Sequence, residues 1–159
     1  VDFNKYIISK TSLMNIDIRY FYQNNKRNVQ IETIINKLVM NVSKHIELPD
    51  TLEFCIYKFD ENVYGGIDKY ITNRLGLNSN LTLEEIPKIL VHELIHVHQR
   101  HTSQLSIKHN TYYWLGIPYH NLDTNLTFEE YKNTPWEMDV ENKQTKVLQQ
   151  ALDILTTNS

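Results

Sequence analysis

The sequence is short of cysteine, of net charge and of long apolar runs, and each shortage excludes a class of protein. Cys55 is the only cysteine, so neither an internal disulfide nor a Cys-x-x-Cys zinc site can form. The formal net charge of -3 argues against a nucleic-acid-binding protein that relies on phosphate contacts. No apolar stretch has the length of a membrane span, and no basic start precedes an apolar run, so we expect no membrane segment and no signal peptide.

The composition is that of one globular unit. A hydrophobic fraction of 41% is enough for a buried core, and 159 residues are typical of one domain. No linker, repeat or low-complexity segment divides the chain. We therefore expect a single domain over residues 1–159. The lone cysteine favours a reducing compartment, so we expect a cytoplasmic protein, in a host cytoplasm or a virion if it is phage-encoded.

The strongest functional signal lies between Val91 and Val97, which reads Val-His-Glu-Leu-Ile-His-Val. This H-E-x-x-H pattern places His92 and His96 one turn apart on one face of a helix, where both imidazoles can bind one metal ion. Glu93 then lies beside the open position of the metal and can act as a general base. The flanking residues are apolar, and buried imidazoles need a partner. The pattern therefore indicates a zinc hydrolase.

Hydrophobic periodicity predicts an α+β fold. The expected elements are strands at 13–22 and 52–59, a helix at 29–46, a turn or bulge at Gly65-Gly66, one or two strands within 67–77 interrupted at Gly76, a hairpin or extended segment at 112–119, and a last helix at 135–155. The motif helix either follows a separate first turn or begins at Ile86 with Pro87 in its first turn. It is expected to end near residues 101–103.

A catalytic zinc ion usually has three protein ligands, and the third is open to several readings. Glu137 is favoured, with Glu141 one turn later on the same face to orient a ligating imidazole. An ordinary capping box of Thr134 and Glu137 is the alternative reading of this segment. His109 is the rival ligand, since SprT-like metalloproteases place a histidine at about its distance from His96.

Three motifs follow one another in the C-terminal half: His92-Glu-Leu-Ile-His-Val-His-Gln99, Trp114-x-Gly116-x-x-Tyr119 and Tyr131-x-x-x-Pro135-Trp-Glu137. In this order they resemble the small gluzincin-type metallopeptidases of phages and bacteria. The resemblance implies that His92, His96 and Glu137 bind zinc and that Glu93 is the catalytic base. It also implies a minimal zincin fold, with a helix, a small antiparallel sheet, the motif helix and a C-terminal helix.

The expected activity is hydrolysis of peptide bonds in a peptide or protein substrate. Zn2+ would acidify water and polarise the scissile carbonyl, while Glu93 takes the proton. Tyr119, His120 and Tyr131 are the candidates for a further hydrogen-bond donor to the oxyanion, and Tyr119 is preferred because its segment is expected to border the cleft.

An extended substrate could pair with a sheet edge near Gly65-Gly66-Ile67. The alternative to a peptidase is a metal-stabilised structural or virion protein without turnover. A closed shell of four ligands, for example with both His109 and Glu137, would favour that alternative, whereas a base at Glu93 argues against it.

Overall fold

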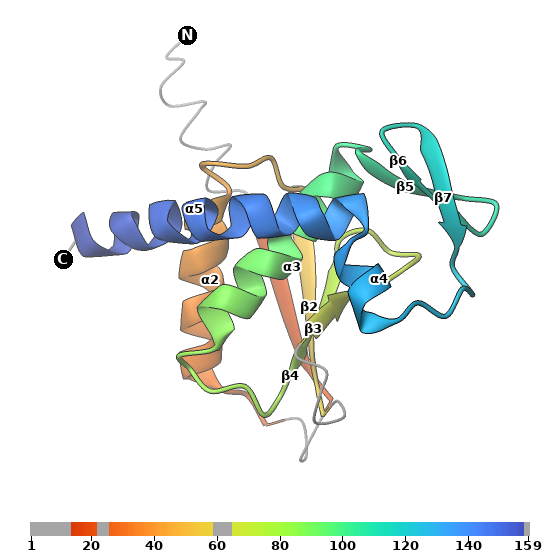
Figure 1. Cartoon of the computed structure of the whole chain (residues 1–159). Helices are drawn as coiled ribbons and strands as arrows, with labels where there is room; N and C mark the ends of the chain where they lie inside the picture. Colours follow the sequence, from red (N-terminus) through yellow and green to blue (C-terminus); the bar gives the residue numbers. More distant parts are fainter. Residues whose placement is uncertain (1–13, 22–25, 59–64, 158–159) are drawn as a thin grey trace, which may run out of the picture.

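The computed structural model describes residues 14–21, 26–58 and 65–157, and it has the expected α+β class (Figure 1). One sheet contains β1 (Asn15–Tyr20), β2 (Thr51–Tyr57), β3 (Gly65–Ile67) and β4 (Arg74–Asn78). The helices are α2 (Val29–Val42), α3 (Ile86–His101), α4 (Phe128–Lys132) and α5 (Pro135–Thr157). A second sheet contains β5 (Leu105–Lys108), β6 (Thr111–Trp114) and β7 (Ile117–Asn121).

The main sheet is mixed, whereas the resemblance implied a small antiparallel sheet. Its order is β1-β2-β4-β3, with β1, β2 and β4 parallel and β3 antiparallel at one edge. Parallel neighbours need a long connection, and α2 supplies one between β1 and β2. Only the β5–β6–β7 sheet, which follows α3 as an up-and-down hairpin pair, is antiparallel throughout.

The core lies between the main sheet and the helices. Leu52, Phe54 and Ile56 alternate along β2, so they share one face of the strand, and all three are fully buried. Helix α5 runs across α2 and α3 (Figure 1) and buries Val140 and Ala151 against the same hydrophobic cluster. The apolar stripes of three helices therefore share one core with the sheet.

The helix boundaries follow the capping signals. Asn28 accepts hydrogen bonds from the second and third backbone N–H groups of α2 and so begins that helix. The helix ends at Val42, four residues before the expected end, and hydrogen-bonded turns continue to Ile46. Helix α3 begins at Ile86 with Pro87 in its first turn and ends at His101, as the sequence predicts.

The prediction of a turn or bulge at Gly65-Gly66 was wrong, because both residues belong to strand β3. The predicted interruption at Gly76 was also wrong, because Gly76 lies within β4 and pairs with Gly66. A Cβ atom on Gly65 would lie 3.0 Å from the carbonyl oxygen of Gly76 and 3.5 Å from Cγ of Glu93. The missing side chain therefore lets β3 pack closely against both β4 and the motif helix α3. The predicted strands at 13–22 and 52–59 are found as β1 and β2, and Leu13, Tyr22 and Phe59 lie outside the described residues.

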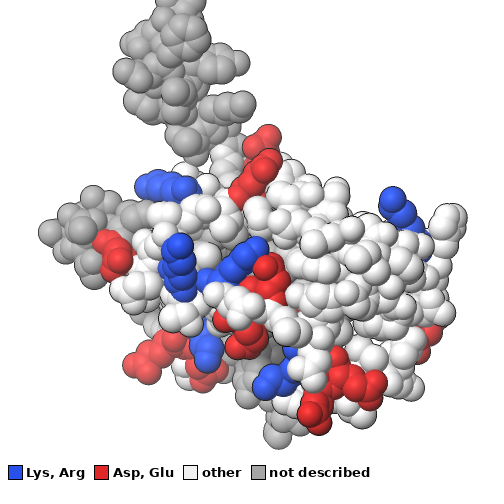
Figure 2. Space-filling view, turned by 45° about the horizontal axis from the view of Figure 1, so that its top comes forward, with Lys and Arg blue, Asp and Glu red and all other residues white. Residues whose placement is uncertain are grey.

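Positive and negative side chains are interspersed over the left and lower parts of the face drawn in Figure 2, whereas the area right of its centre is largely uncharged. Within the described ranges, no helix combines the length and the apolarity that crossing a membrane requires.

Candidate metal centre

Helices α3 and α5 bring together the three residues that the sequence analysis named as zinc ligands. Nε2 of His92 lies 3.4 Å from Oε2 of Glu137, and Nε2 of His96 lies 2.8 Å from Oε1 of the same carboxylate. One potential ligand atom from each residue lies within 4.8 Å of the other two. His96 and Glu137 are buried, and His92 is partly exposed. The three residues thus form one compact cluster of donors suited to a metal ion.

A buried glutamine sets the tautomer of His96. The amide nitrogen of Gln99 donates to the carbonyl oxygen of Trp136 at 2.9 Å and to Oδ2 of Asp139 at 2.9 Å. Since both of these partners only accept, the other amide atom of Gln99, which lies 2.8 Å from Nδ1 of His96, is the oxygen. Nδ1 of His96 must therefore carry a proton, so that in the neutral imidazole Nε2 is the unprotonated acceptor.

A second glutamine does the same for His92. The amide nitrogen of Gln144 donates to the carbonyl oxygen of Lys88 at 3.3 Å, so its oxygen is the atom that lies 3.1 Å from Nδ1 of His92. This contact makes Nδ1 of His92 the N–H donor and turns its Nε2 toward Glu137. Both imidazoles are thus oriented with Nε2, the atom that would bind a metal, facing the carboxylate.

When both imidazoles are neutral, this arrangement places acceptors against acceptors, which a cation would relieve. Nε2 of His96 is buried and has no hydrogen-bond partner among the described residues, even though Oε1 of Glu137 lies 2.8 Å away. A buried polar atom without a partner destabilises a protein by about 1–3 kcal/mol. A single shared proton can bridge only one of the two imidazoles to Glu137, whereas one metal ion would bind all three residues. The residues therefore fit a divalent metal such as zinc, which prefers histidine and carboxylate ligands.

The electrostatics of the cluster follow from burial and from these contacts. Burial opposes the charged form of His92, but its contact with Glu137 and the charge of Glu93 raise the pKa of His92 to about 9. Burial likewise opposes the charge of Glu137, yet its contacts with His92 and His96 hold the pKa of Glu137 well below its usual range. The carboxylate of Glu137 is therefore ionised and ready to bind a cation at neutral pH.

Glu93 lies next to the cluster and is chemically distinct from Glu137. Burial raises the pKa of the Glu93 carboxyl group, and the charges of His96 and His92 oppose this shift. In the part of the chain that the structure describes, no group hydrogen-bonds to the carboxylate of Glu93. A buried carboxylate with a raised pKa and unoccupied oxygens is suited to accept a proton.

Tyr131 is the tyrosine that reaches the cluster. Its hydroxyl group donates to Oε1 of Glu137 at 2.5 Å. Burial and the charge of Glu137 raise the pKa of Tyr131, so the hydroxyl stays protonated and remains a donor. Tyr119, the preferred candidate from the sequence, is 48% exposed and packs edge-on against Trp136. Its catalytic role stays a prediction, whereas Tyr131, which the sequence named only among the alternatives, lies at the cluster.

The other candidates from the sequence lie elsewhere. Glu141 is exposed on α5, and Gln144 has the orienting contact that was expected of Glu141. His109 is exposed in the turn between β5 and β6 and is not part of the cluster. The carboxylate of Glu137 contacts His92, His96 and Tyr131 rather than the backbone N–H of Thr134, so the capping box that was the alternative reading is not formed.

The sequence analysis missed the two orienting glutamines, although helical spacing contains a signal for both. Gln99 lies three residues after His96, a separation that places both side chains on one face of α3. Gln144 lies seven residues after Glu137, which is two turns along the same face of α5. Nothing in this spacing reveals which histidine Gln144 contacts, because His92 belongs to another helix.

A cleft borders the cluster, and we call it the metal-site cleft. Its walls include Glu93, His96, Glu137 and Tyr131, and strand β3 forms one side. In an antiparallel pair of strands, hydrogen-bonded residue pairs alternate with non-hydrogen-bonded ones. The backbone N–H of Asp68 donates to the carbonyl oxygen of Arg74, so the pair two positions away, Gly66 and Gly76, is hydrogen-bonded as well.

The backbone N–H and C=O groups of Gly65 and Ile67 consequently point away from β4, along an edge of the sheet that pairs with no other described strand; we call it the open edge. Because Gly65 packs against Glu93, this open edge lies beside the metal cluster. The edge expected near Gly65-Gly66-Ile67 is therefore present.

Comparisons of the chain with models of protein families, with curated proteins and with solved structures found no match.

Proposed function

We propose that the chain is a zinc-dependent peptidase of the zincin type, which hydrolyses peptide bonds with Glu93 as general base. The observation that carries this proposal is the convergence of the Nε2 atoms of His92 and His96 on the Glu137 carboxylate, with each Nδ1 held by a glutamine oxygen. His92, His96 and Glu137 would hold the zinc ion. Three protein ligands beside an open cleft are the arrangement typical of catalytic rather than structural zinc.

Zinc bound there would supply Lewis acidity, which acidifies water and polarises a carbonyl group. The carboxylate of Glu93 accepts the proton of the attacking water and passes it to the nitrogen of the leaving amine. The hydroxyl of Tyr131 lines the cleft and would stabilise the negative charge on the carbonyl oxygen of the substrate by turning its single O–H from Glu137 to that oxygen.

The proposed substrate is an extended peptide that adds a strand to the edge of β3. The outward N–H and C=O groups of Gly65 and Ile67 are the backbone partners for such a strand. Because Gly65 packs against Glu93, the paired peptide would pass the general base. Cytoplasmic location stays part of this proposal and rests on the lone, buried Cys55.

The two alternatives from the sequence receive less support. A SprT-like site needs His109, which is exposed and outside the cluster. A structural site would be expected to close its shell with a fourth ligand, and the described residues offer a cluster of three.

The test is a comparison of Glu93→Gln with the parent protein and with Glu141→Gln, an exposed control on α5. We expect all three proteins to bind one equivalent of zinc in a chelator competition. The parent and Glu141→Gln should cleave a randomised peptide library, with the products identified by mass spectrometry, and Glu93→Gln should lose at least about 100-fold in rate. Cleavage by Glu93→Gln at the parental rate would overturn the assignment of the base. A parent protein that takes up no zinc would overturn the proposal as a whole.

A further inference from the structure

One cationic side chain in the metal-site cleft has no part in the proposed chemistry. Arg100 lies four residues after His96 and eight after His92, so it continues the metal-binding face of α3 by one turn. It lines the same cleft as Glu93, His96 and Glu137. A substrate that occupies the cleft would therefore meet this guanidinium about one helical turn from the metal cluster.

The hydrogen-bonding capacity of Arg100 is largely unused. Nη2 of Arg100 donates to the carbonyl oxygen of Lys69 at 3.1 Å, and among the described residues the guanidinium forms no ion pair. An arginine has five N–H donors, which are arranged to hold a carboxylate through two parallel bonds. Burial lowers the pKa of Arg100, and the charges of Tyr112 and Asp68 oppose this shift only in part, so the guanidinium is partly desolvated without a close counterion.

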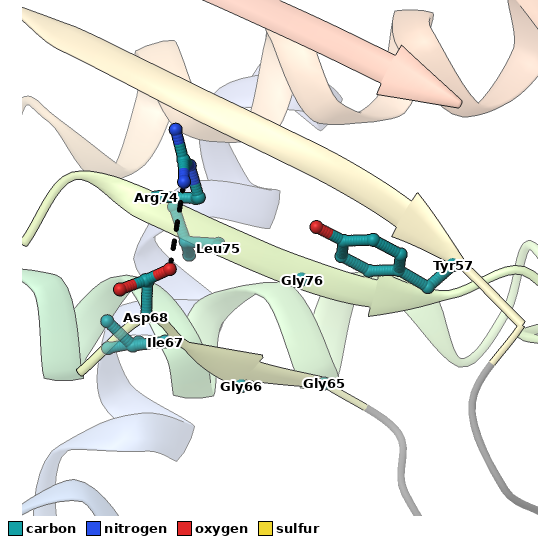
Figure 3. A pocket seen from close by; sticks show the side chains of 8 residues that line it. All are labelled: Tyr57, Gly65, Gly66, Ile67, Asp68, Arg74, Leu75 and Gly76. Atoms are coloured by element: carbon teal, nitrogen blue, oxygen red, sulfur yellow. Dashed lines mark ion pairs between the residues drawn. The ribbon is translucent and has the colours of Figure 1, made fainter. Parts of the chain in front are cut away.

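The nearby acidic residue Asp68 is committed elsewhere. Its Oδ1 accepts the backbone N–H groups of Tyr70 and Ile71, and its Oδ2 lies 3.8 Å from Nη1 of Arg74. Figure 3 shows this ion pair beside the glycines of β3 and β4. Arg74 also binds Glu53, so Asp68 and Arg74 have direct partners, whereas Arg100 interacts with Asp68 only over a distance longer than an ion pair.

We infer that Arg100 binds a carboxylate group of the substrate, so that the enzyme prefers peptides with an acidic residue or a free C-terminus close to the cleaved bond. The inference rests on the proposed peptidase function. A carboxylate would give the partly buried guanidinium its missing partner through a charge-assisted, two-bond contact. Lys69, which also lines the cleft, adds a second positive charge beside the same position.

The direction of the bound peptide decides which carboxylate reaches Arg100. Strand β3 begins at Gly65, beside Glu93, and the chain continues to Lys69, beside Arg100. A peptide that pairs antiparallel to β3 brings residues before the cleaved bond to Arg100, which can then bind only an Asp or Glu side chain. A parallel peptide brings residues after the cleaved bond, and there a C-terminal carboxylate can serve as well.

The experiment uses two matched randomised hexapeptide libraries, one ending in a free carboxylate and one in an amide. Zinc-loaded parent, Arg100→Lys, Arg100→Met and Lys88→Met proteins are compared, with cut positions read by mass spectrometry. Lys88→Met removes one exposed positive charge from the same helix and controls for net charge. In parallel, both libraries are selected for binding to immobilised Glu93→Gln protein with and without Arg100→Met, which gives a readout that does not need turnover.

We expect the parent to favour peptides with a carboxylate at one fixed distance from the cut, and Lys88→Met to keep this preference. Arg100→Met should reduce the preference by about ten- to a hundredfold, and Arg100→Lys should retain part of it. A preference present in both libraries identifies an acidic side chain, and one confined to the free-acid library identifies the C-terminus.

Two results separate the inference from the function on which it rests. Cleavage without a carboxylate preference, or a preference that survives in Arg100→Met, overturns the role of Arg100 and leaves the peptidase intact. Carboxylate-dependent binding to Glu93→Gln protein without cleavage by the parent overturns the peptidase and supports the carboxylate site. Neither cleavage nor carboxylate-dependent binding overturns both.

Discussion

Replacing Gln99 with methionine tests whether a second residue controls how His96 meets the metal. Gln99 is fully buried and joins three groups: Nδ1 of His96 at 2.8 Å, the carbonyl oxygen of Trp136 at 2.9 Å and Oδ2 of Asp139 at 2.9 Å. Methionine has a similar length and fills the space, but it forms none of these hydrogen bonds. The imidazole of His96 would then lose the contact that fixes its proton on Nδ1.

The expected losses of unfolding free energy and of zinc affinity are each large enough to be measured separately. Loss of the amide leaves Nδ1 of His96 without a partner, at about 1–3 kcal/mol. The carbonyl oxygen of Trp136 keeps its hydrogen bond within α5, and Asp139 keeps its ion pair with Lys143 at 2.8 Å, so the loss of these two contacts adds about 1 kcal/mol together. We therefore expect the metal-free variant to lose about 2–4 kcal/mol of unfolding free energy. Zinc affinity should fall by a further factor of about 10–100, the usual effect of removing a group that orients a ligand.

Urea unfolding in the presence of a chelator measures the first quantity, and zinc competition with a colorimetric chelator measures the second on folded protein. The control is Gln149→Met, which removes an exposed amide from α5 and should change stability by less than about 0.5 kcal/mol. If Gln99→Met loses stability but binds zinc as tightly as Gln149→Met, Gln99 is a packing residue and the reasoning about the tautomer of His96 is refuted.

Two further predictions concern the edge strand and pH. A Cβ atom on Gly65 would lie 3.0 Å from the carbonyl oxygen of Gly76, whereas one on Gly66 would meet nothing within 4 Å. Gly65→Ala should therefore lower the unfolding free energy by about 1–3 kcal/mol, and Gly66→Ala should leave it nearly unchanged. If thermal or urea unfolding shows the same change in stability for both variants, β3 is not closely packed at Gly65. In the metal-free protein the pKa of His92 is raised to about 9, and zinc needs the neutral imidazole, so a proton competes with the metal below that pH. The apparent zinc association constant, measured by chelator competition, should rise about tenfold per pH unit from about pH 7 to about pH 9 and level off above that pH. A constant that does not change over this range would show that His92 is not protonated in the metal-free protein.

The sequence alone determined the parts of this protein that depend on local spacing. The H-E-x-x-H segment lies on one helix, so the four-residue separation of His92 and His96 sets their geometry whatever surrounds them. Periodicity likewise located α5, and the alternation in β2 identified its buried face. Pro87 in the first turn of α3 follows from proline chemistry in the same way.

Only the tertiary structure decided the contacts between distant segments. Glu137, Glu141 and His109 were all compatible with local rules, and the packing of α5 against α3 brought Glu137 to the histidines. The same packing decided that Gln144 rather than Glu141 meets His92, and the position of α4 brought Tyr131 to the cluster. Gly65 and Gly66 fit a turn by composition alone, but pairing with β4 and contact with α3 make them an edge strand. Helical and strand periods specify which side chains share a face, whereas the choice of the facing partner depends on how whole elements bury their apolar surfaces together.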